Sequence, residues 1–287
     1  MLDTKIYDVK DEISWCPGCG NYNILPSLKQ ALAELELEPH QVVIVSGIGQ
    51  AAKTPHYMNA NGFNGLHGRA VPPAQGIKIA NKNLKVIIHS GDGDSYGEGG
   101  NHLLHGIRRN VDITHVVHNN QIYGLTKGQA SPTTNLGQIT TMQFDGNTSD
   151  PISPLAFAIS MGCGFVARAF SGDREQLVGI MKEAINYEGY ALIDVLQPCI
   201  AFNKVNTLKW YKDRVYNIDY SSYDNKDRVA AFQKSLEWGD SGIPLGILYK
   251  QEKSSYFDRV NHLKEGPALV DRQWEPKDAE RFMEDFR

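Results

Sequence analysis

The chain has 287 residues, of which 41% are hydrophobic and 22% are charged, the composition of an ordinary soluble globular protein. A chain of this length buries roughly 75% of the surface of the unfolded polypeptide, so its core needs no disulfide bonds. The formal net charge of -4, with no long run of like charges, argues against a nucleic-acid-binding or membrane-surface protein.

The longest apolar stretches, such as residues 42–45 and 86–88, are far shorter than the roughly 20 residues that cross a bilayer. The N-terminal segment MLDTKIYDVKDE is polar and lacks the hydrophobic region of a secretion signal. We therefore expect a cytoplasmic protein with no membrane partner. In that compartment a disulfide framework is not expected.

The predicted elements in the first part of the chain alternate between helices and strands. Apolar residues recur at helical spacing over residues 20–37, and VVIVSGIG (42–49) is typical of a buried strand that opens into a loop. Residues 52–73 have no clear period and are expected to form a loop, followed by a short helix over 74–81. LKVIIHSGDGD (84–94) predicts a strand ending in a glycine turn, with a helix after it at 97–109.

The alternation continues to about residue 200. ITHVVHNN (113–120) predicts a strand, and a long polar loop runs from there to about residue 150. A helix at 154–161, a strand FVARAF, a helix at 173–187 and a strand YALIDVLQP follow. This order predicts an α/β fold with a doubly wound parallel sheet, whose functional loops gather at the carboxyl ends of the strands. We expect one domain over residues 1–200 and an irregular C-terminal extension over 201–287 that packs on the domain or on a partner.

Two polar motifs follow neighbouring predicted strands. Gly91-Asp92-Gly93 ends one strand and Asn119-Asn120 ends the next, with Asp92 and Asn120 separated by 28 positions (120 − 92). A right-handed crossover of that length brings the two strand ends side by side. A carboxylate and an amide oxygen there suit Mg²⁺, which also takes phosphate oxygens, and the glycines let a diphosphate approach the backbone. The alternative is a tight turn and an unrelated pair of asparagines.

The chain has four cysteines, Cys16, Cys19, Cys163 and Cys199. Cys16 and Cys19 flank a Pro-Gly turn, a spacing that lets two thiolates reach one metal ion or one cluster. A zinc site and a thioredoxin-like redox pair are the rival interpretations of this pair taken alone.

In these motifs the sequence resembles thiamine-diphosphate enzymes, and specifically the beta subunit of 2-oxoacid:ferredoxin oxidoreductases. The resemblance spans roughly two thirds of the chain and is carried, in order, by CPGCG (16–20), SGIG (46–49), LHGR (66–69), GDGDSYGEGGNH (91–102), NNQIYGLTKGQASPT (119–133) and QPC (197–199). It implies a sheet of the thiamine-diphosphate-binding type.

The resemblance also implies site residues. Asp92, the side chain of Asn120 and the carbonyl of Ile122 would hold Mg²⁺. The remaining residues of the implied cofactor pocket are Gly93 and Asp94 against the diphosphate, Gly124 and Leu125 against the rings, and Ile48, Gly49, Gln50, Ala51 and His67.

His67 and Lys127 are the candidate catalytic residues. An isolated histidine in a glycine-rich loop is more often a structural hydrogen-bonding group, and an isolated lysine is more often a solvated surface residue. The resemblance favours a role for both near the substrate. A cation at Lys127 would hold the carboxylate of a 2-oxoacid by a charge-assisted hydrogen bond.

Cys199 matches the family's distant ligand to a [4Fe–4S] cluster, together with Cys16 and Cys19. Many relatives supply a fourth cysteine directly after SGIG, where this chain has Gln50. Cys163 is expected to be a small buried residue. The fourth ligand is then a non-cysteine group, a group from a partner, or missing.

The implied activity is the oxidative decarboxylation of a 2-oxoacid to an acyl-coenzyme A, with electrons passing through the cluster to a ferredoxin. The chain has no room for a second, pyrimidine-binding domain, so we expect an alpha subunit that carries it. Pyruvate and 2-oxoglutarate are the candidate substrates, and GIGQAAKTPHY and FNGLHGR favour 2-oxoglutarate. The alternatives are a non-redox thiamine-dependent decarboxylase subunit and a non-enzymatic zinc-binding protein.

Overall fold

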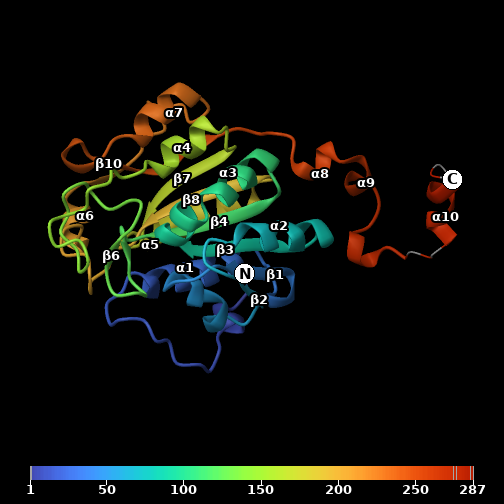
Figure 1. The fold of residues 1–287 in the computed structure, drawn as a ribbon, viewed down its shortest axis with the longest axis horizontal. Coiled ribbons are helices and arrows are strands. Elements are labelled where there is room, and N and C mark those ends of the chain that lie inside the picture. Colours follow the sequence, from blue (N-terminus) through green and yellow to red (C-terminus); the bar gives the residue numbers. More distant parts are fainter. Residues whose placement is uncertain (1, 274, 276, 285, 287) are drawn as a thin grey trace.

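The computed structural model describes residues 2–273, 275, 277–284 and 286. In this part of the chain, eight strands form one sheet in the order β2-β1-β3-β4-β8-β7-β10-β9 (Figure 1). Neighbouring strands are parallel except for β7 and β10. In chain order the strands of the sheet are β1 (Val42–Ser46), β2 (Asn61–Asn64), β3 (Lys85–Gly91), β4 (Ile113–Asn119), β7 (Phe165–Phe170), β8 (Tyr190–Leu196), β9 (Val215–Asn217) and β10 (Ile243–Lys250).

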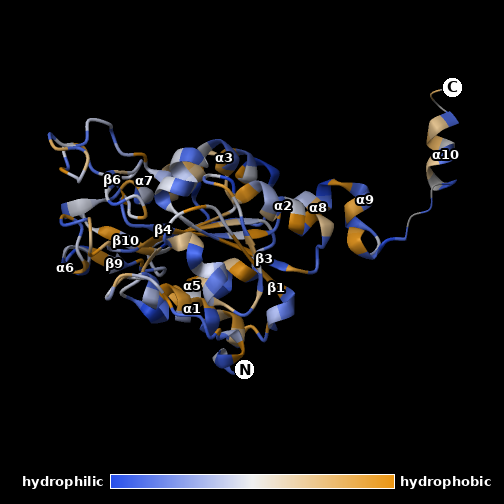
Figure 2. Cartoon of the chain, turned by 60° about the horizontal axis from the view of Figure 1, so that its bottom comes forward, coloured by the Kyte–Doolittle hydropathy of each residue, from blue (hydrophilic) through white to orange (hydrophobic). Residues whose placement is uncertain are grey.

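Helices cover both faces of the sheet. One face packs against α1 (Asn21–Glu34) and α5 (Arg174–Asn186), and the other against α2 (Val71–Ala80), α3 (Gly100–Arg109) and α4 (Pro154–Ser160). The two helix layers explain the continuous apolar runs of the central strands, which Figure 2 shows in hydrophobic colours. Val42 and Ile44 of β1 enter one core, whereas Val43 and Val45 enter the other. The predicted doubly wound α/β fold is therefore confirmed.

The carboxyl ends of the central strands lie side by side, and this arrangement positions the motifs. In the register of the sheet, Ser46 lies beside His89, Gly91 beside His118, and Asn119 beside Leu196. The segments that follow β1, β3, β4 and β8 therefore leave the sheet side by side. As predicted, the loops that carry the motifs gather at the carboxyl ends of the strands.

The structure departs from the local predictions in three segments. Residues 52–73 do not form a loop throughout, because they contain most of a 3₁₀ helix (Ala51–Tyr57), the edge strand β2 and the first turn of α2. All four residues of β2 are exposed, so no apolar alternation marks this strand in the sequence. The helix expected at 97–109 begins only at Gly100 and is preceded by a π-helix (Gly93–Glu98). The long loop after β4 contains a small hairpin of β5 (Ile122–Tyr123) and β6 (Gln129–Ala130).

The C-terminal extension is less irregular than expected. Its β10 pairs antiparallel with β7 and so extends the main sheet. The chain then leaves the sheet as an arm (Figure 1), and Lys82 Nζ donates to the carbonyl of Gly266 in this arm at 2.8 Å. The helices of the extension are α6 (Leu208–Lys212), α7 (Arg228–Ser235), α8 (Tyr256–Arg259), α9 (Asn261–Lys264) and α10 (Lys277–Glu284).

Short 3₁₀ turns complete the described secondary structure, at Thr4–Tyr7, Pro39–Gln41, Gly239–Ser241 and Leu269–Asp271. Within the residues that the structure describes, we find no helix that is both long enough and apolar enough to cross a membrane.

Candidate functional site

A cavity opens at the carboxyl edge of the central strands. Every residue predicted to bind the cofactor or Mg²⁺ lines it: Ile48, Gly49, Gln50 and Ala51 after β1, His67 after β2, Asp92, Gly93 and Asp94 after β3, and Asn120, Ile122, Gly124 and Leu125 after β4. Gly91, His118, Tyr123 and Thr126 complete the lining. The structure thus brings together segments that are up to 78 residues apart in the sequence (126 − 48).

Asp92 directly follows β3, and its side chain is buried. Its Oδ2 atom accepts hydrogen bonds from the hydroxyl groups of Ser131, at 2.5 Å, and Thr133, at 2.7 Å. Burial raises the pKa of this carboxyl to about 6, although the two hydroxyl bonds act to lower it. Because both bonds end on one oxygen, the other oxygen has lone pairs for a cation, whose charge would favour the ionised carboxylate.

The loop after β4 presents an amide and a carbonyl to the same cavity. Asn120 Oδ1 accepts the backbone N–H of Ile122 at 3.1 Å, and an amide oxygen has a second lone pair for a cation. Between them, Gln121 has a positive φ of 59°, and its Nε2 donates to the carbonyl of Thr133 at 2.7 Å. The C-terminal extension also holds this loop, because Asn203 Nδ2 donates to the carbonyl of Asn120 at 3.1 Å.

Asp94 joins two loops of the cavity wall. Its Oδ1 accepts the backbone N–H groups of Ile48, at 3.1 Å, and Gly68, at 2.7 Å, and lies 2.8 Å from His67 Nδ1. A Cβ atom at Gly47 would lie 2.1 Å from Asp94 Oδ2, so this close approach requires glycine at position 47. Burial raises the pKa of Asp94, against the lowering effect of these bonds. Within the described structure, the buried Oδ2 atom has no hydrogen-bond partner.

The walls of the cavity fit a bound diphosphate and its cation. A Cβ atom at Gly49, Gly91 or Gly124 would meet nothing within 4 Å, so the glycines leave open space beside the polar groups. One buried carboxylate, one amide and one backbone carbonyl are the oxygen ligands that Mg²⁺ takes together with phosphate. Leu125 lies at the cavity with its side chain 42% exposed.

The two candidate catalytic residues have different surroundings. His67 lines the cavity, where its Nδ1 contacts Asp94 and its Nε2 lies 3.6 Å from Glu98 Oε2. Lys127 is exposed and is not among the residues that line the cavity. It lies on a tight turn with a φ of 73°, and its N–H donates to the carbonyl of Gly124 at 3.3 Å.

The CPGCG loop lies against the segment that follows β8. Gln197 Nε2 donates to Cys19 Sγ at 3.4 Å, and a Cβ atom at Gly18 would lie 3.4 Å from Ile200. Burial raises the pKa of Cys19 to about 11, and the nearby charges of Cys199 and Cys16 add to the rise. The three cysteines therefore lie close to one another.

No three His, Cys, Asp or Glu side chains in the described part of the chain converge tightly enough to hold a single metal ion. The cysteines of a cubane bind different iron atoms, so they are spaced more widely than the ligands of one ion. Cys163 is buried in the core between α4 and β7, where its Sγ donates to the carbonyls of Phe165 and Tyr190. Its predicted role as a small buried residue is confirmed.

A buried polar network supports the cavity from below. Asp194 on β8 accepts hydrogen bonds from Asn119 Nδ2, at 3.1 Å, and from the hydroxyl of Tyr96, at 2.8 Å. Burial raises the pKa of Asp194, and the charge of Arg168 opposes the rise. Arg168 lies beside Asp194 in the register of β7 and β8, and its guanidinium lies over the ring of Trp238.

Sequence reasoning missed this network and several residues of the site. Asp194 stands in an otherwise apolar strand, which was the available signal for a buried charge. His118 also lines the cavity, and its ring contacts His89 and Asn21 at 2.8 Å each. Ser131 and Thr133 belong to the motif NNQIYGLTKGQASPT (119–133), but their hydrogen bonds to Asp92 depend on tertiary structure.

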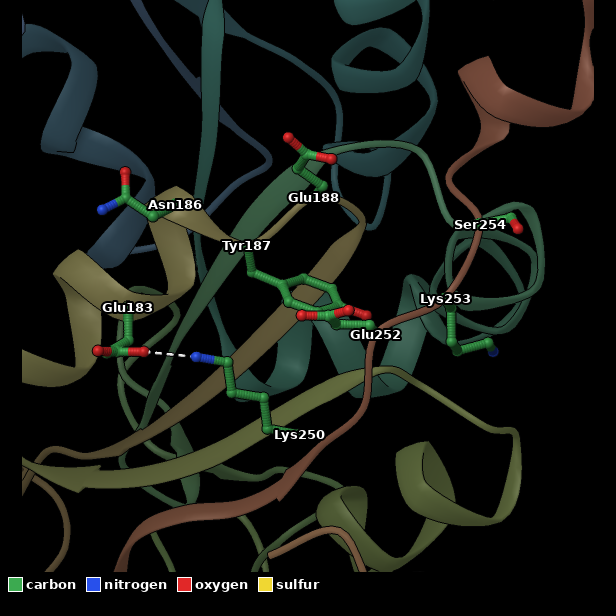
Figure 3. Close-up of a pocket in the computed structure, with 8 residues that line it drawn as sticks. All are labelled: Glu183, Asn186, Tyr187, Glu188, Lys250, Glu252, Lys253 and Ser254. Atoms are coloured by element: carbon green, nitrogen blue, oxygen red, sulfur yellow. Dashed lines mark hydrogen bonds and ion pairs between the residues drawn. The ribbon is translucent and has the colours of Figure 1, made fainter.

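A second cavity lies at the opposite edge of the sheet. It is lined by Glu183, Asn186, Tyr187, Glu188, Lys250, Glu252, Lys253 and Ser254 (Figure 3). Its main internal contact is the ion pair between Lys250 Nζ and Glu183 Oε2, at 2.6 Å. It contains no predicted site residue, because it lies near the amino end of β8.

Two family models match the chain. Residues 40–195 match the C-terminal TPP binding domain of thiamine pyrophosphate enzymes, and residues 199–265 match the C-terminal part of the pyruvate ferredoxin oxidoreductase beta subunit.

Curated and solved relatives agree with these matches. The chain is 46% identical to 2-oxoacid:ferredoxin oxidoreductase 1, subunit beta, of Aeropyrum pernix, covering 86% of this chain and 80% of that protein. It is 48% identical to the corresponding beta subunit of Saccharolobus solfataricus, covering 90% and 88%. It is similar to a solved 2-oxoglutarate:ferredoxin oxidoreductase from Magnetococcus marinus with 2-oxoglutarate, coenzyme A and succinyl-CoA bound, with a TM-score of 0.91, 32% identity, and coverage of 98% and 96%. The chain therefore belongs to the family of 2-oxoacid:ferredoxin oxidoreductase beta subunits.

Proposed function

We propose that this beta subunit, with an alpha subunit, oxidatively decarboxylates a 2-oxoacid to an acyl-coenzyme A and CO₂. It would use thiamine diphosphate with Mg²⁺ and pass electrons through an iron–sulfur cluster to a ferredoxin. The observation that supports this proposal most strongly is the single cavity lined by every predicted cofactor and Mg²⁺ residue. The match of residues 40–195 to a TPP binding domain supports the same cofactor.

The chain's own residues would do three things for the cofactor. Asp92, Asn120 and the carbonyl of Ile122 would bind Mg²⁺. The bonds of Asp94 to Ile48 and Gly68 hold the two wall loops in place beside the cavity. When bound, thiamine diphosphate supplies a nucleophilic carbon and an electron sink for decarboxylation.

Lys127 is proposed to bind the carboxylate of the substrate. It is the cation that follows the cavity residues Gly124, Leu125 and Thr126 along the chain. Among the described residues, we find a hydrogen bond from the backbone N–H of Lys127 but none from its exposed side chain, which would reach a carboxylate at the mouth of the cavity. His67, paired with the buried Asp94, would present its ring at the same cavity.

The three cysteines would bind three irons of a [4Fe–4S] cluster, which would supply one-electron transfer. Cys16, Cys19 and Cys199 lie close together, and Gln197 joins them to the cofactor cavity. The fourth cysteine, Cys163, is enclosed in the core and is not available as a ligand. Residue 50 borders the cysteine loop, since Trp15 Nε1 donates to the carbonyl of Gln50 at 2.8 Å. The fourth corner therefore lacks a thiolate from this chain.

The substrate is proposed to be 2-oxoglutarate, with pyruvate as the second candidate. The similarity to the solved 2-oxoglutarate enzyme from Magnetococcus marinus supports this choice, and so does coenzyme A as the acyl acceptor. The beta-subunit relatives support an alpha subunit as the partner.

The test is to purify the chain with its alpha subunit under anaerobic conditions and assay viologen reduction with each 2-oxoacid. We expect reduction that requires coenzyme A and a 2-oxoacid, in a complex that contains iron and thiamine. Release of CO₂ without viologen reduction or iron would instead identify a non-redox decarboxylase. Zinc without iron or thiamine would refute the enzymatic proposal altogether.

A further inference from the structure

Gln197 lies between the cofactor cavity and the cysteines. It is the first residue after β8, and its side chain is 1% exposed. Its Oε1 accepts the amide N–H of Asn120 at 3.3 Å. Its Nε2 donates to Cys19 Sγ at 3.4 Å and to the carbonyl of Pro198 at 3.1 Å. One side chain therefore contacts a proposed Mg²⁺ ligand at one end and a proposed cluster ligand at the other.

The surrounding hydrogen bonds determine which branch of the Gln197 amide is the oxygen and which is the nitrogen. Asn120 Oδ1 accepts the N–H of Ile122, so its amide nitrogen is the end that faces Gln197. The carbonyl of Pro198 and the sulfur of Cys19 both require a donor. Only a side chain with an acceptor on one branch and a donor on the other satisfies all of these partners.

The backbone on both sides of Gln197 keeps this position rigid. The N–H of Gln197 donates to the carbonyl of Asn119 at 2.9 Å, which continues the pairing of β4 and β8 by one residue. A Cβ atom at Gly20 would lie 2.8 Å from Gln197 Cγ. The last glycine of CPGCG is therefore what lets Gln197 pack against the cysteine turn.

We propose that Gln197 is a positioning residue shared by the two sites, which orients Asn120 for the cation and tunes the redox potential of the group that Cys19 binds. The proposal rests on the proposed function. A hydrogen bond to a ligating sulfur stabilises the reduced, more negative form and so raises the reduction potential. In a buried site this effect is stronger than in water, because little solvent competes for the bond. The acceptor end acts on the other site, because partners of metal ligands typically affect metal affinity about 10- to 100-fold.

The test compares Gln197→Glu and Gln197→Leu in the complex with the alpha subunit. Gln197→Glu keeps an acceptor for Asn120 but loses the donor to Cys19, whereas Gln197→Leu loses both. Gln75→Glu, which alters a buried glutamine of α2, is the matched control. The readouts are the midpoint potential of the cluster, followed by electron paramagnetic resonance, and the dissociation constant of thiamine diphosphate with Mg²⁺.

We expect both Gln197 variants to have a lower midpoint potential than the wild type and the control. Gln197→Leu should also bind thiamine diphosphate about 10-fold or more weakly, whereas Gln197→Glu should bind it nearly as well as the wild type. If Gln197→Leu does not fold, Gln197→Glu alone decides the question by a lowered potential with retained thiamine affinity. An unchanged potential in a variant with full iron content would overturn the proposal, as would equal loss of thiamine affinity in both variants. A wild-type complex without iron or thiamine would instead refute the proposed function.

Discussion

Replacing Asp92 by Asn should make the cofactor-free protein more stable and should abolish its stabilisation by thiamine diphosphate with Mg²⁺. The carboxylate of Asp92 is buried, and its only described side-chain donors are the hydroxyls of Ser131 and Thr133. Asparagine has nearly the same shape and keeps an oxygen that accepts both hydroxyl bonds. It removes the charge, and with it the cost of burying that charge.

The magnitude follows from the pKa of Asp92, which burial raises from 3.8 to about 6. This difference between the unfolded and the folded pKa corresponds to ~3 kcal/mol. Because the folded state binds this proton more tightly than the unfolded state, the cost is absent below about pH 4 and complete above about pH 6. The free energy of unfolding of Asp92→Asn should therefore exceed that of the wild type by ~3 kcal/mol near about pH 8, and by almost nothing near about pH 4.

Urea unfolding of both proteins at the two pH values, without and then with thiamine diphosphate and Mg²⁺, measures the effect. In thermal unfolding, ~3 kcal/mol corresponds to about 6 °C for a chain of this size. Ligand at about 100 times its dissociation constant should stabilise the wild type by ~2.7 kcal/mol and leave the variant nearly unchanged. A variant that is less stable than the wild type at both pH values would refute the reasoning, and so would a variant that the ligand still stabilises.

Three further predictions concern the remaining proposed roles. Lys127→Met should raise the KM for the 2-oxoacid about 10-fold or more, with unchanged thiamine affinity, because it removes a charge-assisted bond. If its kinetics equal those of the wild type and of Lys127→Arg, Lys127 is a solvated surface lysine. Cys199→Ala should lose iron, measured anaerobically. Cys163→Ala should keep its iron and lose about 1 kcal/mol of stability, because Cys163 lies in the core. The reverse pattern of iron loss would mean that Cys163, and not Cys199, is the third ligand. The chain without its alpha subunit should show no turnover, and full activity of the isolated chain would mean that it carries a pyrimidine-binding half of its own.

Much of the fold was predictable because the central strands are buried on both faces. β1, β3, β4 and β8 are short apolar runs between turn residues, and such runs can be recognised as buried strands from the sequence alone. β2 has only exposed residues, so nothing in NGFN indicates a strand. In β10, Pro244 and Gly246 interrupt the apolar pattern, and its place beside β7 depends on a chain reversal that no local signal specifies.

The placement of candidate residues was predictable where they directly follow neighbouring strands. It was not predictable for contacts that depend on the exact alignment of one strand with the next. Asp92 and Asn120 follow neighbouring parallel strands, so topology alone places them together. The pairing of Arg168 with Asp194 needs the exact alignment of β7 with β8. The Gln197 bridge needs the fold of the CPGCG turn as well, because only the packing of that turn brings Cys19 to Gln197.

The late strand β10 has a consequence for how the chain is synthesised. β7 is an edge strand until residues 243–250 have left the ribosome, and an open edge offers unpaired backbone groups to other chains. The contact of Asn203 with Asn120 and that of Tyr211 with Gln121 also form only after residue 200. A fragment that ends at residue 200 would carry every proposed ligand of the cofactor and the cluster. We expect it to aggregate through β7 nevertheless, since the last strand to be made is the one that protects this edge of the sheet.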